Sequence, residues 1–120
     1  MKLIFNLFLF IFLSSPSFSQ NLLSQYLIKT KGITVGDMLW ELNLQNGAYE
    51  TKIEIKNRGF LSGLYSFSGS YVAYGKIVNK ILIPTKYTQR WQTKKKSRNI
   101  EILFKQNTID YLEITPTEIE

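Results

Sequence analysis

The stretch MLWELNLQNGAYETKIEI, residues 38–55, decides the fold of this chain. Apolar residues alternate with polar ones on both sides of Asn46-Gly47, and a period of two residues is the pattern of a half-buried strand. Asn-Gly is the preferred pair for a two-residue type I′ turn, because both central residues of that turn need a positive φ. The stretch therefore predicts an antiparallel hairpin that turns at Asn46-Gly47.

A two-residue turn also fixes the register of the hairpin. On one face it pairs apolar residues with apolar or β-branched ones: Leu44 with Tyr49, Leu42 with Thr51, Trp40 with Ile53 and Met38 with Ile55. On the other face it places Glu41 opposite Lys52 and Asp37 opposite Lys56. Opposite charges that face each other across two strands stabilise a sheet. A slip by one residue would bury the charged set, so the sequence predicts one apolar face and one charged face.

The same period of two residues extends outward from the hairpin. Further strands are predicted over residues 23–30, 66–78, 81–93, 99–105 and 108–115. A bulge near Gly36-Asp37, with Ile28 facing Val35, would restore the period before Met38. Pro84 predicts that its strand starts irregularly or lies at an edge. Residues 59–65 are expected to form either a wide loop or one short helical turn.

The predicted fold class is all-β. About seven strands in sequential hairpins favour an antiparallel meander, curved into an open sheet or a half-open barrel. The chain of 120 residues fits a single β domain over residues 20–120, and the abrupt end after Pro116 suggests truncation at the C-terminus.

The composition narrows the chemistry that this chain can support. Cysteine and histidine are both absent, which removes thiolate nucleophiles and the commonest general base and metal ligand. No phosphate-binding loop and no nucleophile elbow is present. Asp37, Glu41, Glu50 and Glu54 all fall on the paired, charged face of the hairpin, where salt bridges at the surface are expected. We therefore expect no enzyme, no catalytic residue, no metal site and no cofactor.

The N-terminus has the pattern of a signal peptide. Lys2 precedes an apolar run over residues 3–13, and Ser17 and Ser19 occupy the −3 and −1 positions of a cleavage before Gln20. An uncleaved anchor is the alternative, but a membrane span needs about 20 apolar residues. The sequence predicts export, to the periplasm of a bacterium, after removal of residues 1–19 and without a transmembrane span in the mature form.

Two surfaces are candidates for binding. The first is a basic turn formed by Arg90, Lys94, Lys95, Lys96 and Arg98, within a segment, residues 71–105, that carries nine basic residues and one acidic residue. Export argues against nucleic acid, and an anionic envelope component is the expected partner, with a solvated hairpin tip as the alternative. The second is an apolar concave face around Trp40, Ile53 and Phe67, which would suit an acyl chain or another apolar ligand.

Several short motifs, in order, resemble a known family. They are Tyr26 followed by Gly32-Ile33-Thr34-Val35-Gly36, the Asn46-Gly47 hairpin, Arg58-Gly59-Phe60-Leu61-Ser62-Gly63-Leu64, Ser68-Gly69-Ser70, Ile83-Pro84-Thr85-Lys86-Tyr87 and Ile100-Glu101-Ile102. Over residues 26–116 this order resembles the bacterial exported family catalogued as domain of unknown function 3108. The resemblance implies an exported compartment and this strand order, and it supplies no active residues. Members of that family are usually longer, which implies a truncated chain or a short relative.

The resulting hypothesis is a periplasmic, non-enzymatic accessory or binding module for a lipid-like or envelope ligand. The alternative is a structural or protein-interaction module of the cell envelope.

Overall fold

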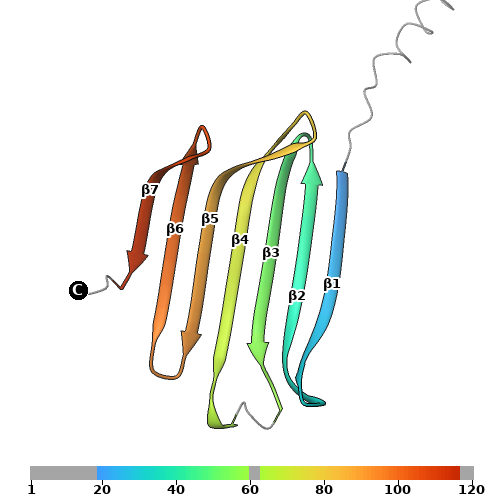
Figure 1. The fold of residues 1–120 in the computed structure, drawn as a ribbon, viewed down its shortest axis with the longest axis vertical. Helices are drawn as coiled ribbons and strands as arrows, with labels where there is room; N and C mark the ends of the chain where they lie inside the picture. The colour runs from blue at the N-terminus through green and yellow to red at the C-terminus, as the bar shows by residue number, and fades with distance from the viewer. Residues whose placement is uncertain (1–18, 60–62, 117–120) are drawn as a thin grey trace, which may run out of the picture.

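The computed structural model describes residues 19–59 and 63–116, which form a single antiparallel sheet. Its seven strands are β1 (Ser19–Thr30), β2 (Ile33–Gln45), β3 (Ala48–Asn57), β4 (Phe67–Val78), β5 (Ile81–Thr93), β6 (Ser97–Lys105) and β7 (Thr108–Thr115). Each strand pairs with its neighbours in sequence, so β1 and β7 form opposite edges of an open sheet (Figure 1). The prediction of an all-β meander is confirmed, and the sheet does not close into a barrel.

The central hairpin has the predicted register. Trp40 lies opposite Ile53, Leu44 opposite Tyr49, and all the other predicted pairs of β2 and β3 are present. Asn46 and Gly47 have φ of 50° and 73°, the values that a type I′ turn requires. The prediction from residues 38–55 is therefore confirmed pair by pair.

Three further hairpins use the same kind of two-residue turn. Lys31-Gly32, Asn79-Lys80 and Gln106-Asn107 all have positive φ at both positions. Such turns match the right-handed twist of the strands they join. With the Asn46-Gly47 turn, they link the seven strands into one group of three, β1 to β3, and two pairs, β4 with β5 and β6 with β7. The remaining connections are a longer segment between β3 and β4 and a short basic turn between β5 and β6.

Some boundaries and irregularities differ from the prediction. β1 begins at Ser19, four residues before the predicted start. The bulge before Met38 falls at Val35, because Ile28 pairs with Gly36 and Lys29 pairs with Thr34; the predicted Ile28–Val35 pair is wrong. Gly36 is needed as the paired residue, since a Cβ there would lie 2.8 Å from the Lys56 carbonyl oxygen.

Pro84 shows why a proline is tolerated inside this sheet. β5 starts irregularly, as predicted, with a register shift against β4 that leaves Thr85 unpaired. Pairing of β5 with β6 begins only at Lys86, so Pro84 has no partner strand on that side. Its missing N–H therefore breaks no hydrogen bond of that ladder.

The segment after Asn57 is tied to both neighbouring strands. The Arg58 N–H donates to the Val35 carbonyl at 3.0 Å, and the Phe67 N–H donates to Asn57 Oδ1 at 2.9 Å. The Asn57 side-chain amide donates to the Tyr65 carbonyl. Gly63 and Leu64 have helical geometry, which agrees with a short helical turn; residues 60–62 lie outside the described residues, as do residues 1–18 of the predicted signal peptide.

The two faces of the sheet differ sharply in chemistry. One row across all seven strands consists almost wholly of uncharged, mostly apolar residues: Leu22, Leu42, Thr51, Ala73, Tyr87, Ile102 and Leu112. The side chains of the adjacent row point to the opposite side of the sheet, and four of the seven are charged: Leu23, Glu41, Lys52, Val72, Thr88, Glu101 and Glu113. We call these sides the apolar face and the charged face. Neither face is covered by another described element (Figure 1).

Candidate binding surface

The polar groups on the apolar face are hydrogen-bonded to one another. The Trp40 Nε1–H donates to Thr51 Oγ1 at 2.8 Å, and the Thr51 hydroxyl in turn donates to the Glu41 carbonyl at 3.3 Å. The Tyr87 hydroxyl donates to Gln89 Oε1 at 2.9 Å. Because these donors and acceptors already have partners, contact with an apolar surface costs little desolvation here.

Two glycines of β4 let aromatic rings lie flat on this face. Tyr49 lies opposite Gly75, and a Cβ added to Gly75 would come within 2.4 Å of the Tyr49 ring. Gly69 is similarly covered by the side chain of Tyr71, whose hydroxyl oxygen would lie 2.9 Å and nearest ring atom 3.0 Å from an added Cβ. Tyr49 is accordingly the one large apolar side chain of the described residues that is buried, at 9% exposure.

The rest of the apolar face is half-buried, as at Leu42 and Ile102, or exposed to solvent. Leu22 is 51% exposed, Trp40 40% and Leu112 52%, although these residues sit on different strands across the sheet. Soluble monomers seldom leave so continuous an apolar surface uncovered, and such surfaces usually mark a binding partner. The apolar face is therefore the first component of the candidate surface.

The predicted apolar residues lie together on this face. Trp40 is directly opposite Ile53, Ile53 is opposite Tyr71, and Phe67 lies four residues before Tyr71 on the same strand. Trp91 shares the face too, since it pairs with Gly69 on β4. Both tryptophans of the chain thus belong to the apolar face.

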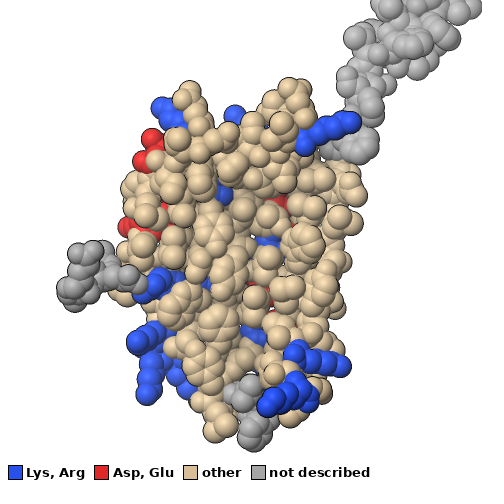
Figure 2. Space-filling view, viewed as in Figure 1, with Lys and Arg blue, Asp and Glu red and all other residues tan. Residues whose placement is uncertain are grey.

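Basic residues gather at one end of the sheet, which we call the basic end. The meander brings the β1–β2, β3–β4 and β5–β6 connections to this end (Figure 1). The half of the sheet nearest these connections contains two acidic residues, Asp37 and Glu54, and nine basic ones: Lys29, Lys31, Lys56, Arg58, Arg90, Lys94, Lys95, Lys96 and Arg98. The other half of the described sheet has five of each sign. In Figure 2 the broad middle of one face carries few charged side chains, and Lys and Arg project at its ends.

The predicted basic turn is the largest contributor to this end. Thr93 shapes the turn: its N–H donates to the Lys96 carbonyl at 2.7 Å, and its Oγ1 accepts the Lys96 N–H at 3.0 Å. The Lys94 Nζ reaches the Gly63 carbonyl at 3.5 Å, which places the β5–β6 turn beside the β3–β4 connection. The turn is therefore held in a defined shape with its lysines exposed.

Two arginines connect the basic turn to the two faces. The Arg98 guanidinium lies 5.8 Å from the centre of the Trp91 ring, on the apolar face. Arg90 Nε donates to Asn99 Oδ1 at 3.0 Å, on the charged face. Arg98 thus brings positive charge to the border of the apolar face.

Four of the nine basic residues at this end were not predicted from the sequence. They are Lys29, Lys31, Lys56 and Arg58, which are 32 or more residues earlier than Arg90 in the chain. The signal was present in the predicted topology, because every second connection of a meander lies at the same end. Adding up the basic residues in and beside the first, third and fifth connections therefore predicts this cluster.

The charged face is neutralised locally, though not always by the predicted partners. Lys52 pairs with Glu54 at 2.8 Å along its own strand, and Asp37 pairs with Arg58 at 3.2 Å. Glu41 lies opposite Lys52 and Asp37 opposite Lys56, as the predicted register requires. The ion pairs, however, form between Lys52 and Glu54 and between Asp37 and Arg58. The hydrogen bond to Glu54 raises the pKa of Lys52, with a smaller electrostatic contribution from Glu41.

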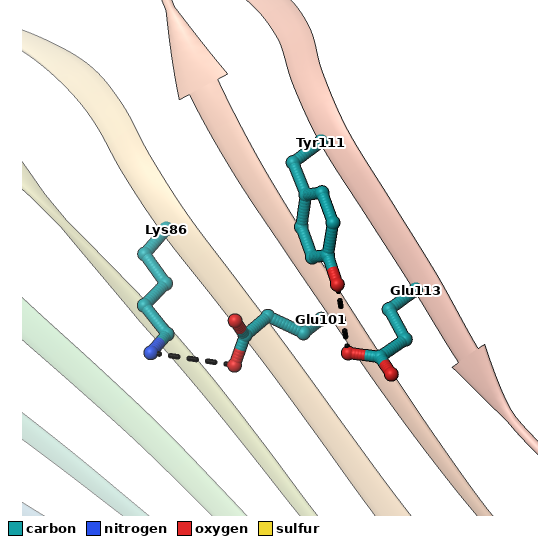
Figure 3. A network of polar contacts seen from close by, with 4 residues as sticks. All are labelled: Lys86, Glu101, Tyr111 and Glu113. Atoms are coloured by element: carbon teal, nitrogen blue, oxygen red, sulfur yellow. Dashed lines mark hydrogen bonds and ion pairs between the residues drawn. The ribbon is translucent and has the colours of Figure 1, made fainter.

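A second polar cluster spans β5, β6 and β7 (Figure 3). Lys86 Nζ lies 3.4 Å from Glu101 Oε2, and the Tyr111 hydroxyl donates to Glu113 Oε2 at 2.9 Å. Glu101 and Glu113 lie directly opposite each other, so their like charges repel. The ion pair with Lys86 stabilises the Glu101 carboxylate, and the hydrogen bond from Tyr111 stabilises that of Glu113. The hydrogen bond to Glu113 raises the pKa of Tyr111.

The charged face also contains a shallow hollow of about 610 Å³. It forms where Ser68 and Ser70 of β4 lie between longer side chains of the neighbouring strands, such as Lys56 and Arg90. Its lining mixes acids, bases, hydroxyls and amides without a convergent pair of catalytic groups. Trp40, Ile53 and Phe67 do not line this hollow.

Within residues 19–59 and 63–116, no three Asp or Glu side chains come together as a metal site would require. Among the same residues, no helix has the length and apolar character needed to cross a membrane.

Comparison with known proteins gives no match: no family model, no curated protein and no solved structure is similar to this chain. The resemblance to the exported family of unknown function therefore stays a prediction.

Proposed function

We propose that this protein is a non-enzymatic, exported binding module for an amphiphile with an anionic head group, such as a phospholipid of the cell envelope. The observation that carries the proposal is the uncovered apolar face bordered by the basic end. An acyl chain would lie across the flat aromatic and aliphatic side chains, and the phosphate would meet the lysines of the β5–β6 turn. Export to the periplasm, inferred from the N-terminal pattern, supplies the compartment in which such ligands occur.

Charge and apolar area have to act together in this proposal. Each lysine near an anionic lipid surface contributes about 1 kcal/mol. Apolar burial contributes roughly 25 cal/mol for each Å² removed from water. An apolar ligand without charge would use only the face, and a small anion would use only the basic end. The combination favours an amphiphile over either.

The two tryptophans provide a direct experiment, because Trp40 and Trp91 both lie on the apolar face. We expect an anionic lysophospholipid with a brominated acyl chain to quench tryptophan fluorescence. Glycerol phosphate, which has the same anionic group without the chain, should not. Absence of quenching at saturating lysophospholipid would overturn the proposal.

A matched pair of triple variants tests the head-group site. Lys94→Gln, Lys95→Gln and Lys96→Gln together should weaken binding by about 100-fold, from the loss of roughly 3 kcal/mol. The control changes Lys76, Lys80 and Lys105 to Gln, which removes the same charge from the other half of the sheet. Equal affinities of the two triple variants would rule out the basic end as the head-group site.

A further inference from the structure

The two edge strands of the sheet differ in how they are protected. β7 carries Asp110 and Glu113, its register against β6 is interrupted, and Pro116 follows it directly. Charges, irregular register and proline all discourage pairing with another strand. β1 has no charged residue and no proline from Ser19 to Ile28, and its register is regular over that length. The open edge of β1 is therefore a template for a further strand.

β1 also carries large apolar residues on both of its sides. Leu22 and Tyr26 belong to the apolar face, as expected from the rest of the sheet. Leu23 and Leu27 lie on the charged face and are 63% and 54% exposed. An outer strand that faced only water on that side would carry polar residues there, as β3 does with Glu50 and Lys52. The two leucines indicate a neighbour beyond the edge.

The sequence of β1 is complementary to itself in the antiparallel direction. If Gln25 lies opposite Gln25 of a second copy, Leu23 meets Leu27 and Leu22 meets Ile28 of that copy. The paired residues lie on matching sides, because their positions differ by an even number. Cross-strand apolar pairs of this kind stabilise a sheet, and no charge is placed opposite a like charge within this register.

We propose that β1 pairs antiparallel with β1 of a second copy, centred on Gln25, to form a two-fold dimer with one continuous sheet. The two-fold axis runs perpendicular to the sheet, so the apolar faces of both copies lie on the same side. The same rotation sends the two basic ends to opposite ends of the dimer. Parallel pairing would instead bring the two positive ends together, and the charge distribution disfavours it.

The proposal is tested on the protein expressed from its full sequence, by light scattering of the purified form. The wild type should have the mass of two copies. Gln25→Lys should have the mass of one copy, because two lysines would face each other at the centre, and Gln25→Glu should behave the same way. A mixture of the two variants should recover the mass of two copies, since Lys then faces Glu. Gln106→Lys, in the β6–β7 turn, is the control and should remain dimeric.

A cross-link gives an independent measurement, because the chain contains no cysteine. Gln25→Cys should form a disulfide-linked dimer under mild oxidation, and Gln106→Cys should not. A wild type with the mass of one copy, Gln25 variants that remain dimeric, or open-ended assemblies formed by β1 with β7 would each overturn the proposal. Tryptophan quenching by lysophospholipid in the Gln25→Lys variant separates this result from the proposed function, which does not need the dimer.

Discussion

At the scale of single residues, the contact between Tyr49 and Gly75 packs β3 closely against β4, next to the β2–β3 turn. A Cβ at Gly75 would come within 2.3 Å of the Ile83 carbonyl oxygen as well as 2.4 Å of the Tyr49 ring. The backbone oxygen cannot move aside without breaking the β4–β5 ladder. The ring of Tyr49, the one buried aromatic ring among the described residues, would be displaced at the same time.

We therefore predict that Gly75→Ala lowers the free energy of unfolding by about 2 kcal/mol or more, within the range for overpacked sites. Gly69→Ala should cost less, because the atoms nearest its added Cβ belong to the Tyr71 side chain, which can rotate away. Urea unfolding of the two variants measures the difference. A Gly69→Ala variant that is the less stable of the two would contradict this account.

The pairing of residues across strands could be predicted from the sequence because turn geometry fixes the backbone register. The partners of flexible charged side chains could not be predicted in the same way. Trp40 and Ile53 face each other because turn geometry leaves no other register. Lys52 has several carboxylates within reach, and its flexible side chain contacts Glu54 instead of the opposite Glu41. The sequence therefore predicted which residues lie on the charged face, but not which of them form ion pairs with one another.

At the scale of the elements, turn chemistry separates the well-adapted hairpins from the strained ones. Asn46-Gly47 suits positive φ, but Lys80 in the β4–β5 turn has a φ of 62°. A residue with a Cβ loses roughly 1–2 kcal/mol in that conformation, and glycine does not. Replacement by glycine would remove this strain. Part of the gain in stability would be lost again, because glycine makes the unfolded chain more flexible and so raises the entropy cost of folding.

We predict that Lys80→Gly raises the free energy of unfolding by about 0.5–1 kcal/mol, measured by urea denaturation. Lys76→Gly is the matched control, since Lys76 is exposed in the extended β4 strand. There glycine should destabilise the protein by a similar amount. A loss of stability in both variants would mean that the positive φ of Lys80 carries little strain.

Strand irregularities were predicted in kind but not in position. A bulge was expected beside Gly36, and it occurs one residue earlier because the close approach of Lys56 requires a glycine in the paired position. Pro84 was expected at an irregular start or an edge, and it lies where β6 has not yet begun to pair. Both positions depend on neighbouring strands, which local sequence patterns do not specify.

At the scale of the whole molecule, the arrangement of charge comes from the topology. No single segment of sequence shows the basic end, because its lysines and arginines come from three separate connections and the strand ends beside them. The apolar face is likewise assembled from short alternations on seven strands. The hairpin at residues 38–55 predicted the character of both faces, and the meander determines how far each one extends.

A single sheet with one open apolar face also has a thermodynamic consequence. Stable domains normally bury such a face against a second layer, and here the described residues include only one large buried apolar side chain, Tyr49. Whatever covers the apolar face therefore contributes to folding itself. A ligand that binds only the folded state stabilises it by about 2.7 kcal/mol when present at 100 times its Kd.

We predict that an anionic lysophospholipid, kept below its micelle-forming concentration, raises the midpoint of thermal unfolding in proportion to the logarithm of its concentration. A zwitterionic lysophospholipid with the same chain should act only at higher concentration, because it lacks net attraction to the basic end. Circular dichroism in the far ultraviolet follows the loss of the sheet. In the triple Lys94, Lys95 and Lys96 to Gln variant the difference between the two lipids should be smaller than in the wild type, since the variant keeps the apolar face but loses three charges of the basic end. If the anionic lipid stabilised wild type and variant alike, the extra stability would have to arise from the apolar face alone.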